Sequence, residues 1–369
     1  MRILYFSKDY TTHDYRFLSA LARTEHHIGF LRLERGKQVL EKRSLPCEIE
    51  IIPWAGGKRS QRIIDIPNLL RSLKRVIKKF HPDIIQTGPI QRSAFLVALT
   101  GFEPLLTMSW GYDLLVDANR NRLWQWITSY TLKRSAVLVG DCETIRRRAV
   151  SFGMRPDRII TFPWGADINR YSPGDDGGLR KQLGWGDDVF VLLSTRSWEP
   201  IYGVVDLVKA FIFAAQKRPE LRLLLLGGGS EDIEIHRLIN SAGVGDKVKY
   251  AGLISQEELP RYYRAADIYV SASYSDGTSI SLLEALATGL PAIVSDIPGN
   301  REWITPGQEG WLFSVGDPET LVNAIVYAND HRSQLLTMGR KARLLAEQRG
   351  NWEENFPKLF DAFTIAMND

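Results

Sequence analysis

Short apolar runs alternate along the chain with longer segments whose apolar positions recur at helical spacing. Each short run predicts a buried β-strand, and each longer segment predicts an amphipathic helix. The predicted strands are 2–7, 28–33, 49–53, 83–87, 105–109, 136–140, 159–163, 189–194, 222–226, 248–251, 268–271, 292–295 and 310–313. The predicted helices include 17–23, 68–80, 123–134, 204–217 and 279–288. Strands that alternate with helices are typical of βαβ units, which build parallel sheets.

A run of turn residues at 172–178 separates two such series of strands and helices. A chain of 369 residues is also longer than one hydrophobic core usually holds. We therefore predict an α/β fold of two doubly wound, Rossmann-like domains, residues 1–172 and 173–351. Ligands of such sheets bind beyond the carboxyl ends of the strands, so an interdomain cleft is the expected site.

Composition narrows the class of protein. Apolar residues make up 44% of the chain and charged residues 24%, as in soluble globular proteins. The two cysteines, Cys47 and Cys142, are too few for a disulfide framework, and no cysteine–histidine cluster has zinc spacing. No apolar run is long enough to cross a bilayer. We therefore expect a cytoplasmic protein without a bound metal.

Charge is divided unevenly along the chain. Residues 1–172 hold 28 basic and 16 acidic side chains, whereas the remainder holds 19 and 27. Such asymmetry indicates that the two halves have different partners. An anionic membrane, an acidic acceptor and a nucleic acid are the candidates for the basic half, and no nucleic-acid-binding motif accompanies its charge.

The segment 275–291 carries the most informative chemistry. Asp276 and Glu284 lie eight residues apart, and Gly277, Thr278 and Ser279 form a turn that leads into an apolar helix beginning near Ile280. A helix N-terminus offers N–H groups and a positive dipole end, which suit a diphosphate. One carboxylate can then bind the hydroxyls of a sugar and the other those of a ribose. The segment therefore predicts a site for a sugar nucleotide.

This arrangement resembles the GT-B glycosyltransferases, in particular their large retaining family 4. The family signature is an acid, seven residues, a glutamate and then Ala-x-Ala-x-Gly-x-Pro, and residues 276–291 match it. Further matching segments are 161–167 with 171–173, 250–253, 263–267 and 297–302, so the resemblance covers nearly the whole chain. One departure is that the first acid, usually a glutamate, is the shorter Asp276.

The resemblance implies a hexosyltransferase that uses a UDP- or GDP-sugar as donor and needs neither cofactor nor metal. It implies retention of the anomeric configuration. The acceptor would be a hydroxyl group of a sugar, a glycolipid or another molecule, with lipid-linked and cell-envelope or exopolysaccharide precursors among the candidates. It also implies that a C-terminal helix, about 352–369, crosses back to the first domain.

Another matching segment, 195–203, follows a predicted strand. The resemblance implies that Arg196 binds the donor diphosphate and stabilises the leaving group, with Asp276 positioning the donor sugar and Glu284 the ribose. At the position where the family has a lysine, this chain has Tyr202. We expect backbone N–H groups from Gly277 to Ile280 to compensate. By the same resemblance, Gly229 and Leu253 border the base and the ribose.

In the first domain, the segment 8–17 replaces a glycine-rich loop that family members often have. There His13 and Asp14 are candidates for orienting an acceptor hydroxyl. After the strand 105–109, the family's usual histidine is missing, and Trp110 and Asp113 stand nearby. We expect Trp110 to stack on a sugar ring and place Asp113, with Arg196 and Asp276, among the catalytic candidates. A packed tryptophan and a helix-capping aspartate are the structural alternatives.

The helix predicted at 68–80 carries an apolar stripe and several lysines and arginines off that stripe. Such a helix can lie on an anionic bilayer, which would make the protein peripheral on the inner face of the cell membrane. The alternative is a helix that faces the core and has a solvated basic side. The basic run at 146–148 adds charge to the same domain without distinguishing the two.

Two other functions stay open at this point. A sugar-nucleotide epimerase can share the GT-B fold and would need acid and base groups, for which His13 and Asp14 are the candidates. A donor-binding protein without turnover is the other, because the family's histidine and lysine are both missing.

Overall fold

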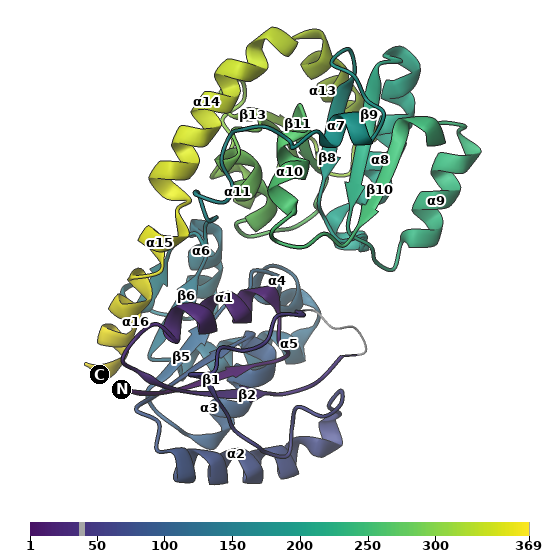
Figure 1. Cartoon of the computed structure of the whole chain (residues 1–369). Coiled ribbons are helices and arrows are strands. Elements are labelled where there is room, and N and C mark those ends of the chain that lie inside the picture. Colours follow the sequence, from purple (N-terminus) through teal and green to yellow (C-terminus); the bar gives the residue numbers. More distant parts are fainter. Residues whose placement is uncertain (37–40, 369) are drawn as a thin grey trace. The chain divides into compact units, whose positions relative to one another are not determined.

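The computed structural model describes residues 1–36 and 41–368 (Figure 1). Contacts between residues divide the chain into two compact units. The first unit comprises residues 1–162 together with 356–368, and the second unit comprises 163–355. The boundary between them lies before residue 172, at which the sequence analysis placed the end of the first domain. The C-terminal helix α16 (Lys358–Met367) packs in the first unit, against β5, β6 and β7.

The described part of the first unit contains a parallel sheet in the order β3-β2-β1-β4-β5-β6-β7. Its strands are β1 (Arg2–Ser7), β2 (His27–Arg32), β3 (Glu50–Ile51), β4 (Ile84–Gly88), β5 (Leu105–Met108), β6 (Val137–Gly140) and β7 (Ile159–Thr161). Its other helices are α1 (Thr12–Leu21), α2 (Ile66–Phe80), α3 (Phe95–Thr100), α4 (Tyr112–Leu115), α5 (Arg122–Lys133) and α6 (Glu143–Ser151).

The second unit contains a parallel sheet in the order β10-β9-β8-β11-β12-β13. Its strands are β8 (Phe190–Ser194), β9 (Leu221–Leu226), β10 (Val248–Gly252), β11 (Ile268–Ser271), β12 (Ala292–Ser295) and β13 (Gly310–Phe313). Its helices are α7 (Leu179–Gln182), α8 (Val204–Lys217), α9 (Asp232–Ser241), α10 (Leu259–Arg264), α11 (Ile280–Ala287), α12 (Pro298–Arg301), α13 (Pro318–Asp330), α14 (Arg332–Arg349) and α15 (Trp352–Asn355).

The second sheet is covered by helices on both faces. Successive residues of a strand point to opposite faces. Phe190 and Leu192 of β8 therefore join a core with α8 and α13, whereas Val191 and Leu193 join another with α11 and α14. Both cores are almost fully buried, which explains why the strands read as continuous apolar runs.

Each sheet has one place where the strand order reverses direction. In the first unit β1 lies between β2 and β4, and in the second unit β8 lies between β9 and β11. The loops that leave these neighbouring strands diverge at their carboxyl ends and form the usual place for a ligand in a doubly wound sheet. The segments after β1 and β4, and after β8 and β11, are therefore the places to look for a site.

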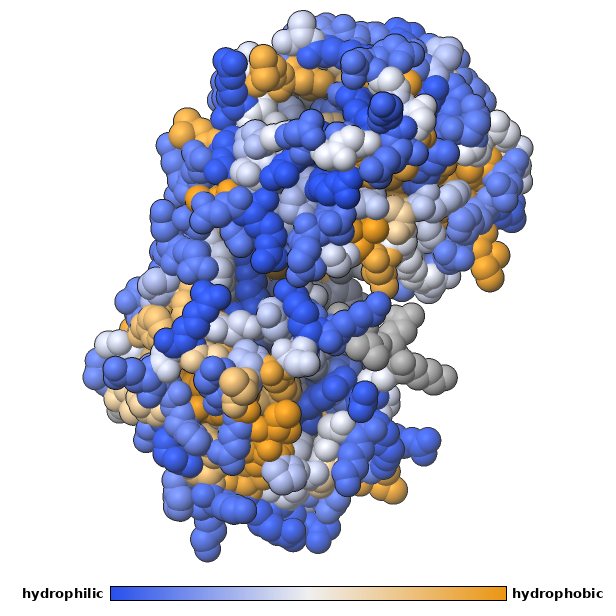
Figure 2. All heavy atoms as spheres, viewed as in Figure 1, coloured by the Kyte–Doolittle hydropathy of each residue, from blue (hydrophilic) through white to orange (hydrophobic). Residues whose placement is uncertain are grey.

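The predicted strands are all present, with ends that differ by at most a few residues. The helix predicted at 17–23 instead begins at Thr12, because Thr11 caps it and Asp14 completes a capping box. Among residues 1–36 and 41–368, no helix combines the length and the hydrophobicity that crossing a bilayer requires. In the view of Figure 2, hydrophilic side chains cover most of the surface, and hydrophobic side chains gather in smaller groups.

Candidate functional site

The N-terminus of α11 forms the centre of the candidate site in the second unit. This helix follows β11, and Ser279 caps it by accepting a hydrogen bond from the Leu282 backbone N–H at 3.4 Å. Leu282 and Leu283 pack in the core, which fixes the direction of the helix. Thr278 and Ser279 are themselves buried. The start of the helix, with its positive dipole end, is thus held firmly beside the carboxyl ends of β8 and β11.

Arg196, which follows β8, reaches this helix start. Its guanidinium donates to the Asp276 carboxylate at 2.7 Å and to the Ser279 hydroxyl at 2.7 Å. It also lies 3.2 Å from the Ser281 hydroxyl. The side chain is only 11% exposed, and its Nε–H makes no hydrogen bond to any residue that the structure describes. The structure therefore brings together Arg196, Asp276 and Ser279.

The guanidinium of Arg196 is stabilised in its charged form by its neighbours. Burial lowers the pKa of its guanidinium, but the nearby Asp276 carboxylate and several tyrosines outweigh burial and raise the pKa above its usual range. The ring of Tyr202 lies under the guanidinium, with 4.1 Å between the guanidinium carbon and the ring centroid. Tyr202 therefore contributes an aromatic face to Arg196 where the family has a second cation.

Glu284 lies farther along α11 and is 7% exposed. Its Oε2 accepts a hydrogen bond from the buried Tyr263 hydroxyl at 2.9 Å. Burial and, after it, the charge of Glu284 raise the pKa of Tyr263 well above its ordinary value, so the hydroxyl stays protonated and orients the carboxylate. The hydrogen bond from Tyr263 thus fixes the orientation of the Glu284 carboxylate.

Two glycines near the site, Gly229 and Gly299, leave no room for a side chain. A Cβ on Gly229 would lie 2.4 Å from the Trp198 carbonyl oxygen, and a Cβ on Gly299 would lie 2.3 Å from the Gly277 carbonyl oxygen. Both contacts are closer than a side chain can tolerate. Leu253, which follows β10, is 80% exposed and offers an apolar surface to solvent.

Two contributors to this site were missed by the sequence analysis. Ser281 lies near Arg196 and also hydrogen bonds to Tyr269 at 2.8 Å. Tyr263 holds Glu284, as described above. The signal for Ser281 was its place two residues after the cap Ser279 on the first turn of the helix. Tyr263 begins the matching segment 263–267, but the sequence analysis gave it no role toward Glu284.

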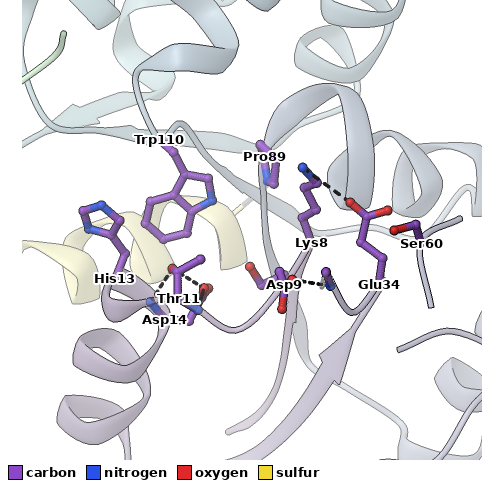
Figure 3. A pocket seen from close by; sticks show the side chains of 11 residues that line it. Lys8, Asp9, Thr11, His13, Asp14, Glu34, Ser60, Pro89 and Trp110 are labelled. Carbon is purple, nitrogen blue, oxygen red and sulfur yellow. Dashed lines mark hydrogen bonds and ion pairs between the residues drawn. The ribbon is translucent and has the colours of Figure 1, made fainter. Parts of the chain in front are cut away.

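The first unit contains a cavity of about 650 Å³ at the carboxyl ends of β1, β4 and β5 (Figure 3). Most of its lining comes from the segment that follows β1. The lining residues are Ser7, Lys8, Asp9, Thr11, His13, Asp14, Glu34, Gly36, Ser60, Pro89 and Trp110. Three of the residues predicted for the acceptor side, His13, Asp14 and Trp110, therefore lie around one cavity.

His13 and Trp110 form one wall of this cavity (Figure 3). Their rings stack with centroids 5.4 Å apart and an interplanar angle of 23°. Phe17 of α1 packs against Trp110 edge-on, with 6.1 Å between the ring centroids. An indole held in this way presents a fixed apolar face, which suits the flat side of a sugar ring.

Asp14 is part of the framework of α1. It is 1% exposed, and its carboxylate accepts hydrogen bonds from the Thr11 backbone N–H at 2.9 Å and from the Tyr5 hydroxyl at 3.1 Å. Burial raises the pKa of Asp14 to about 6. The observed contacts make Asp14 a cap for the helix start that lines the cavity, and its predicted role toward an acceptor hydroxyl stays a prediction.

Asp113 is also buried, and it does not line the cavity. Its carboxylate accepts hydrogen bonds from the Ser109 hydroxyl at 2.7 Å and from the backbone N–H groups of Leu114 at 3.0 Å and Ile90 at 3.1 Å. Burial raises the pKa of Asp113 to about 6. In this arrangement Asp113 ties the loop after β4 to the loop after β5, and its predicted catalytic role stays a prediction.

The cavity also has charged groups that the sequence analysis did not single out. Lys8 and Glu34 form an ion pair at 3.4 Å, and Asp9 accepts a hydrogen bond from the Gly36 backbone N–H at 3.0 Å and pairs with Arg32. These contacts join the segment after β1 to the segment after β2. Within the described ranges 1–36 and 41–368, no group of three or more histidine, cysteine, aspartate or glutamate side chains is arranged to hold a metal ion.

Two family models match the chain. The model described as glycosyl transferases group 1 matches residues 176–345, and the model described as glycosyl transferase 4-like matches residues 2–141. The first match contains the Arg196 and α11 site, and the second contains every residue that lines the cavity in the first unit.

Curated relatives include D-inositol 3-phosphate glycosyltransferase 2 of Catenulispora acidiphila, which is 29% identical over 227 residues. That match covers 59% of this chain and 53% of the relative. A GDP-mannose-dependent monoacylated alpha-(1-6)-phosphatidylinositol monomannoside mannosyltransferase of Corynebacterium glutamicum is 29% identical over 220 residues, which cover 57% of each chain. The matched region thus spans about half the length of these relatives.

Solved structures with the same fold match along almost the whole chain. Sucrose-phosphate synthase from Thermosynechococcus elongatus has a TM-score of 0.82 at 20% identity, and the match covers 99% of this chain and 98% of that one. HepE from Anabaena, in complex with UDP-glucose, has a TM-score of 0.79 at 19% identity, with 99% of each chain covered. At these identities the likeness shows the fold.

Proposed function

The chain belongs to the group 1 glycosyltransferases and has the GT-B fold, and from this premise we propose that it is a hexosyltransferase. In this proposal it moves a sugar from a nucleotide diphosphate sugar to a hydroxyl acceptor with retention of the anomeric configuration. The observation that carries the proposal is the buried guanidinium of Arg196, held beside Asp276 at the N-terminus of α11.

The donor diphosphate would bind between Arg196 and the start of α11. The Nε–H of Arg196 is buried and has no acceptor among the described residues, so a phosphate oxygen would satisfy it. The N–H groups at the helix start would share the remaining negative charge. Because the site is largely buried, these interactions are stronger than they would be in water. They would also stabilise the nucleoside diphosphate as it leaves, which is the main electrostatic demand of the reaction.

The two carboxylates would recognise the sugars. An ionised carboxylate is an acceptor only, so Asp276 can take hydrogen bonds from donor-sugar hydroxyls while its other oxygen keeps the ion pair with Arg196. We assign Glu284 to the ribose, because Tyr263 fixes its orientation. By the same resemblance Gly229 and Leu253 would border the base.

The acceptor would bind in the cavity of the first unit, with a sugar ring on Trp110. A UDP- or GDP-sugar is the proposed donor, since a relative is named for GDP-mannose and a similar structure holds UDP-glucose. The proposed acceptor is a sugar or glycolipid of the cell envelope or an exopolysaccharide, and the reaction would need no metal.

Incubation of the purified chain with UDP- and GDP-sugars and a panel of glycoside acceptors tests this proposal. Proton NMR would follow nucleoside diphosphate release and the anomeric configuration of the product. We expect release that depends on an acceptor and a product with the donor's configuration. Isomerised nucleotide sugar in the absence of acceptor would instead identify an epimerase. Donor binding without release on every acceptor would identify a binding protein.

We further propose that the protein is cytoplasmic and associates peripherally with the inner face of the membrane through the basic first unit. Helix α2 was the predicted contact, but Leu69, Leu73, Val76 and Phe80 of its apolar stripe are buried in the core. The helix therefore offers a bilayer only its basic side. Of the basic run at 146–148, Arg146 is tied to the backbone carbonyls of Ile159 and Pro156, so it supports the fold.

A further inference from the structure

Helix α5 presents an apolar stripe to solvent on the side opposite its packed face. Its buried residues are Thr128, Thr131 and Leu132, which face the core of the first unit. On the other side, Leu123 is 58% exposed and Trp126 is 53% exposed. Residues at i, i+3 and i+7 share one face of a helix, so Tyr130 lies next along this stripe, half-buried against the core that α2 and α3 also contact.

The stripe is an ordered aromatic cluster. Trp126 stacks on Tyr130 with centroids 5.3 Å apart and an interplanar angle of 29°. Phe95, from the neighbouring helix α3, packs edge-on against both, at 6.1 Å from Trp126 and 5.9 Å from Tyr130. A preformed cluster loses little side-chain entropy when it is buried, so it suits a binding surface.

The helices around this cluster carry charge of one sign, with the acidic Asp65 just before α2 and Glu103 just after α3. Helices α2, α3 and α5 form one layer, since α3 packs against both of the others (Figure 1). Together these helices carry seven basic residues and no acidic residue: Arg71, Lys74, Arg75, Lys78 and Lys79 on α2, and Arg122 and Lys133 on α5. Arg134 follows α5 directly, and its guanidinium lies 5.3 Å from the Tyr130 ring centroid.

We propose that the α2–α3–α5 face of the first unit docks on an anionic lipid bilayer. Tryptophan and tyrosine favour the boundary between hydrocarbon and headgroups, and lysine and arginine favour lipid phosphates. Trp126 and Leu123 enter this boundary while the basic residues of α2 and α5 contact the headgroups. Leu123 and Trp126 thus supply exposed apolar side chains that α2 cannot offer, because the apolar residues of α2 are buried. A second copy of the chain is a poorer occupant, because two copies would bring like charges together. The inference rests on the proposed peripheral association and names its contact face, and it does not depend on the proposed transfer reaction.

Sedimentation of the full chain with lipid vesicles tests this proposal. We expect binding to phosphatidylcholine vesicles that contain about a third of phosphatidylglycerol, weak binding to pure phosphatidylcholine, and release as salt rises. The double variant Leu123→Ser, Trp126→Ser should bind the anionic vesicles about tenfold more weakly, because it removes two side chains that leave water. The control is Phe213→Ser on α8 in the second unit, whose side chain is 57% exposed and which should bind as the parent chain does.

The charged part of the face has its own matched pair of variants. Arg122→Gln with Lys133→Gln should weaken binding and reduce its dependence on salt. Arg340→Gln with Lys341→Gln on α14 removes the same charge from the second unit and should leave binding nearly unchanged. Unaltered melting temperatures and far-ultraviolet spectra would show that each variant folds.

Three results would overturn the proposal. One is an absence of binding to anionic vesicles at low salt. Another is equal binding by the Leu123→Ser, Trp126→Ser variant and the parent chain. The third is a dimer in solution that this variant converts to a monomer, which would make the face a contact between copies of the chain.

Discussion

At the scale of single residues, the guanidinium of Arg196 carries most of the proposed chemistry. It touches Asp276 and Ser279, rests on the ring of Tyr202 and keeps one buried N–H without an acceptor among the described residues. Tyr202 does not restore the charge of the lysine that the family has at its position. The diphosphate would therefore depend on one cation and the helix start, which makes Arg196 harder to replace.

Arg196→Ala should lower kcat about 100- to 1000-fold while the donor KM changes only a few-fold, because the lost interaction grows as the leaving group gains charge. Steady-state kinetics with the best donor would measure both constants. Arg340→Ala on α14, which lies outside the site, is the control. A variant at position 196 with the parent's kcat would remove Arg196 from the reaction.

Asp113 illustrates a residue whose sequence context did not reveal its contacts. It follows a strand, as cleft residues do, yet its oxygens turn inward to Ser109, Leu114 and Ile90. The direction of a side chain after a strand depends on the loop that packs beside it. For Asp113 this is the segment after β4, which contains Ile90 and lies 23 residues away in the sequence. Sequence periodicity carries no such information.

The titration of Asp113 gives a second prediction. Its pKa is about 6 in the folded protein, against 3.8 ordinarily, so the folded state binds this proton more tightly than the unfolded chain. The proton on Asp113 therefore stabilises the folded state fully below about pH 4. This stabilisation, at most about 3 kcal/mol, is lost as pH rises through about 6. Asp113→Asn cannot ionise, and its melting temperature should fall less than the parent's between these pH values.

The test compares how steeply the melting temperature of each chain falls with pH. A loss of stability in Asp113→Asn that is the same at every pH therefore does not affect it. Asp246→Asn, at an exposed position, is the control and should follow the parent chain. If Asp113→Asn and the parent lost the same number of degrees across this range, the carboxyl would not be titrating as its burial requires.

At the scale of elements, most strands could be predicted from the sequence because those in the middle of each sheet are buried on both faces and read as continuous apolar runs. Helix α11 was also predictable, since its apolar positions and its cap are local features. The start of α1 was not, because the segment 8–17 is polar and its helical part depends on the capping box of Thr11 and Asp14. In the candidate site, Asp276 and Glu284 came from their spacing around a helix start and Arg196 came from resemblance, whereas the roles of Ser281 and Tyr263 needed the packing of α11.

The tight contact between α12 and the turn before α11 gives an element-scale prediction. A Cβ on Gly299 would lie 2.3 Å from the Gly277 carbonyl oxygen and 2.7 Å from that of Asp276. Gly299→Ala should therefore displace this turn, cost about 1–3 kcal/mol of stability and weaken donor binding. Thermal melting and calorimetric titration with the donor would measure the two effects.

Gly245→Ala is the matched control, because no atom lies within 4 Å of the added Cβ there. It should melt and bind as the parent chain does. Unchanged donor affinity in Gly299→Ala, despite a lower melting temperature, would show that the donor does not contact the displaced turn.

At the scale of the whole molecule, each unit places its candidate site at the reversal of strand order in its own sheet. The sites differ in chemistry. The second unit offers a cation, two carboxylates and a helix start, whereas the first offers an aromatic wall and a cavity with paired charges. This difference fits the proposed donor in the second unit and the proposed acceptor in the first, and separate family models match the two halves.

The most direct test of the central claim is a crystal structure of the chain with a bound nucleoside diphosphate, UDP or GDP according to which binds more tightly. We expect the diphosphate within hydrogen-bond distance of the Arg196 guanidinium and of backbone N–H groups in residues 277–281, with the ribose at Glu284. A diphosphate bound elsewhere on the chain, with Arg196 still engaged only by Asp276 and the serines, would contradict the account.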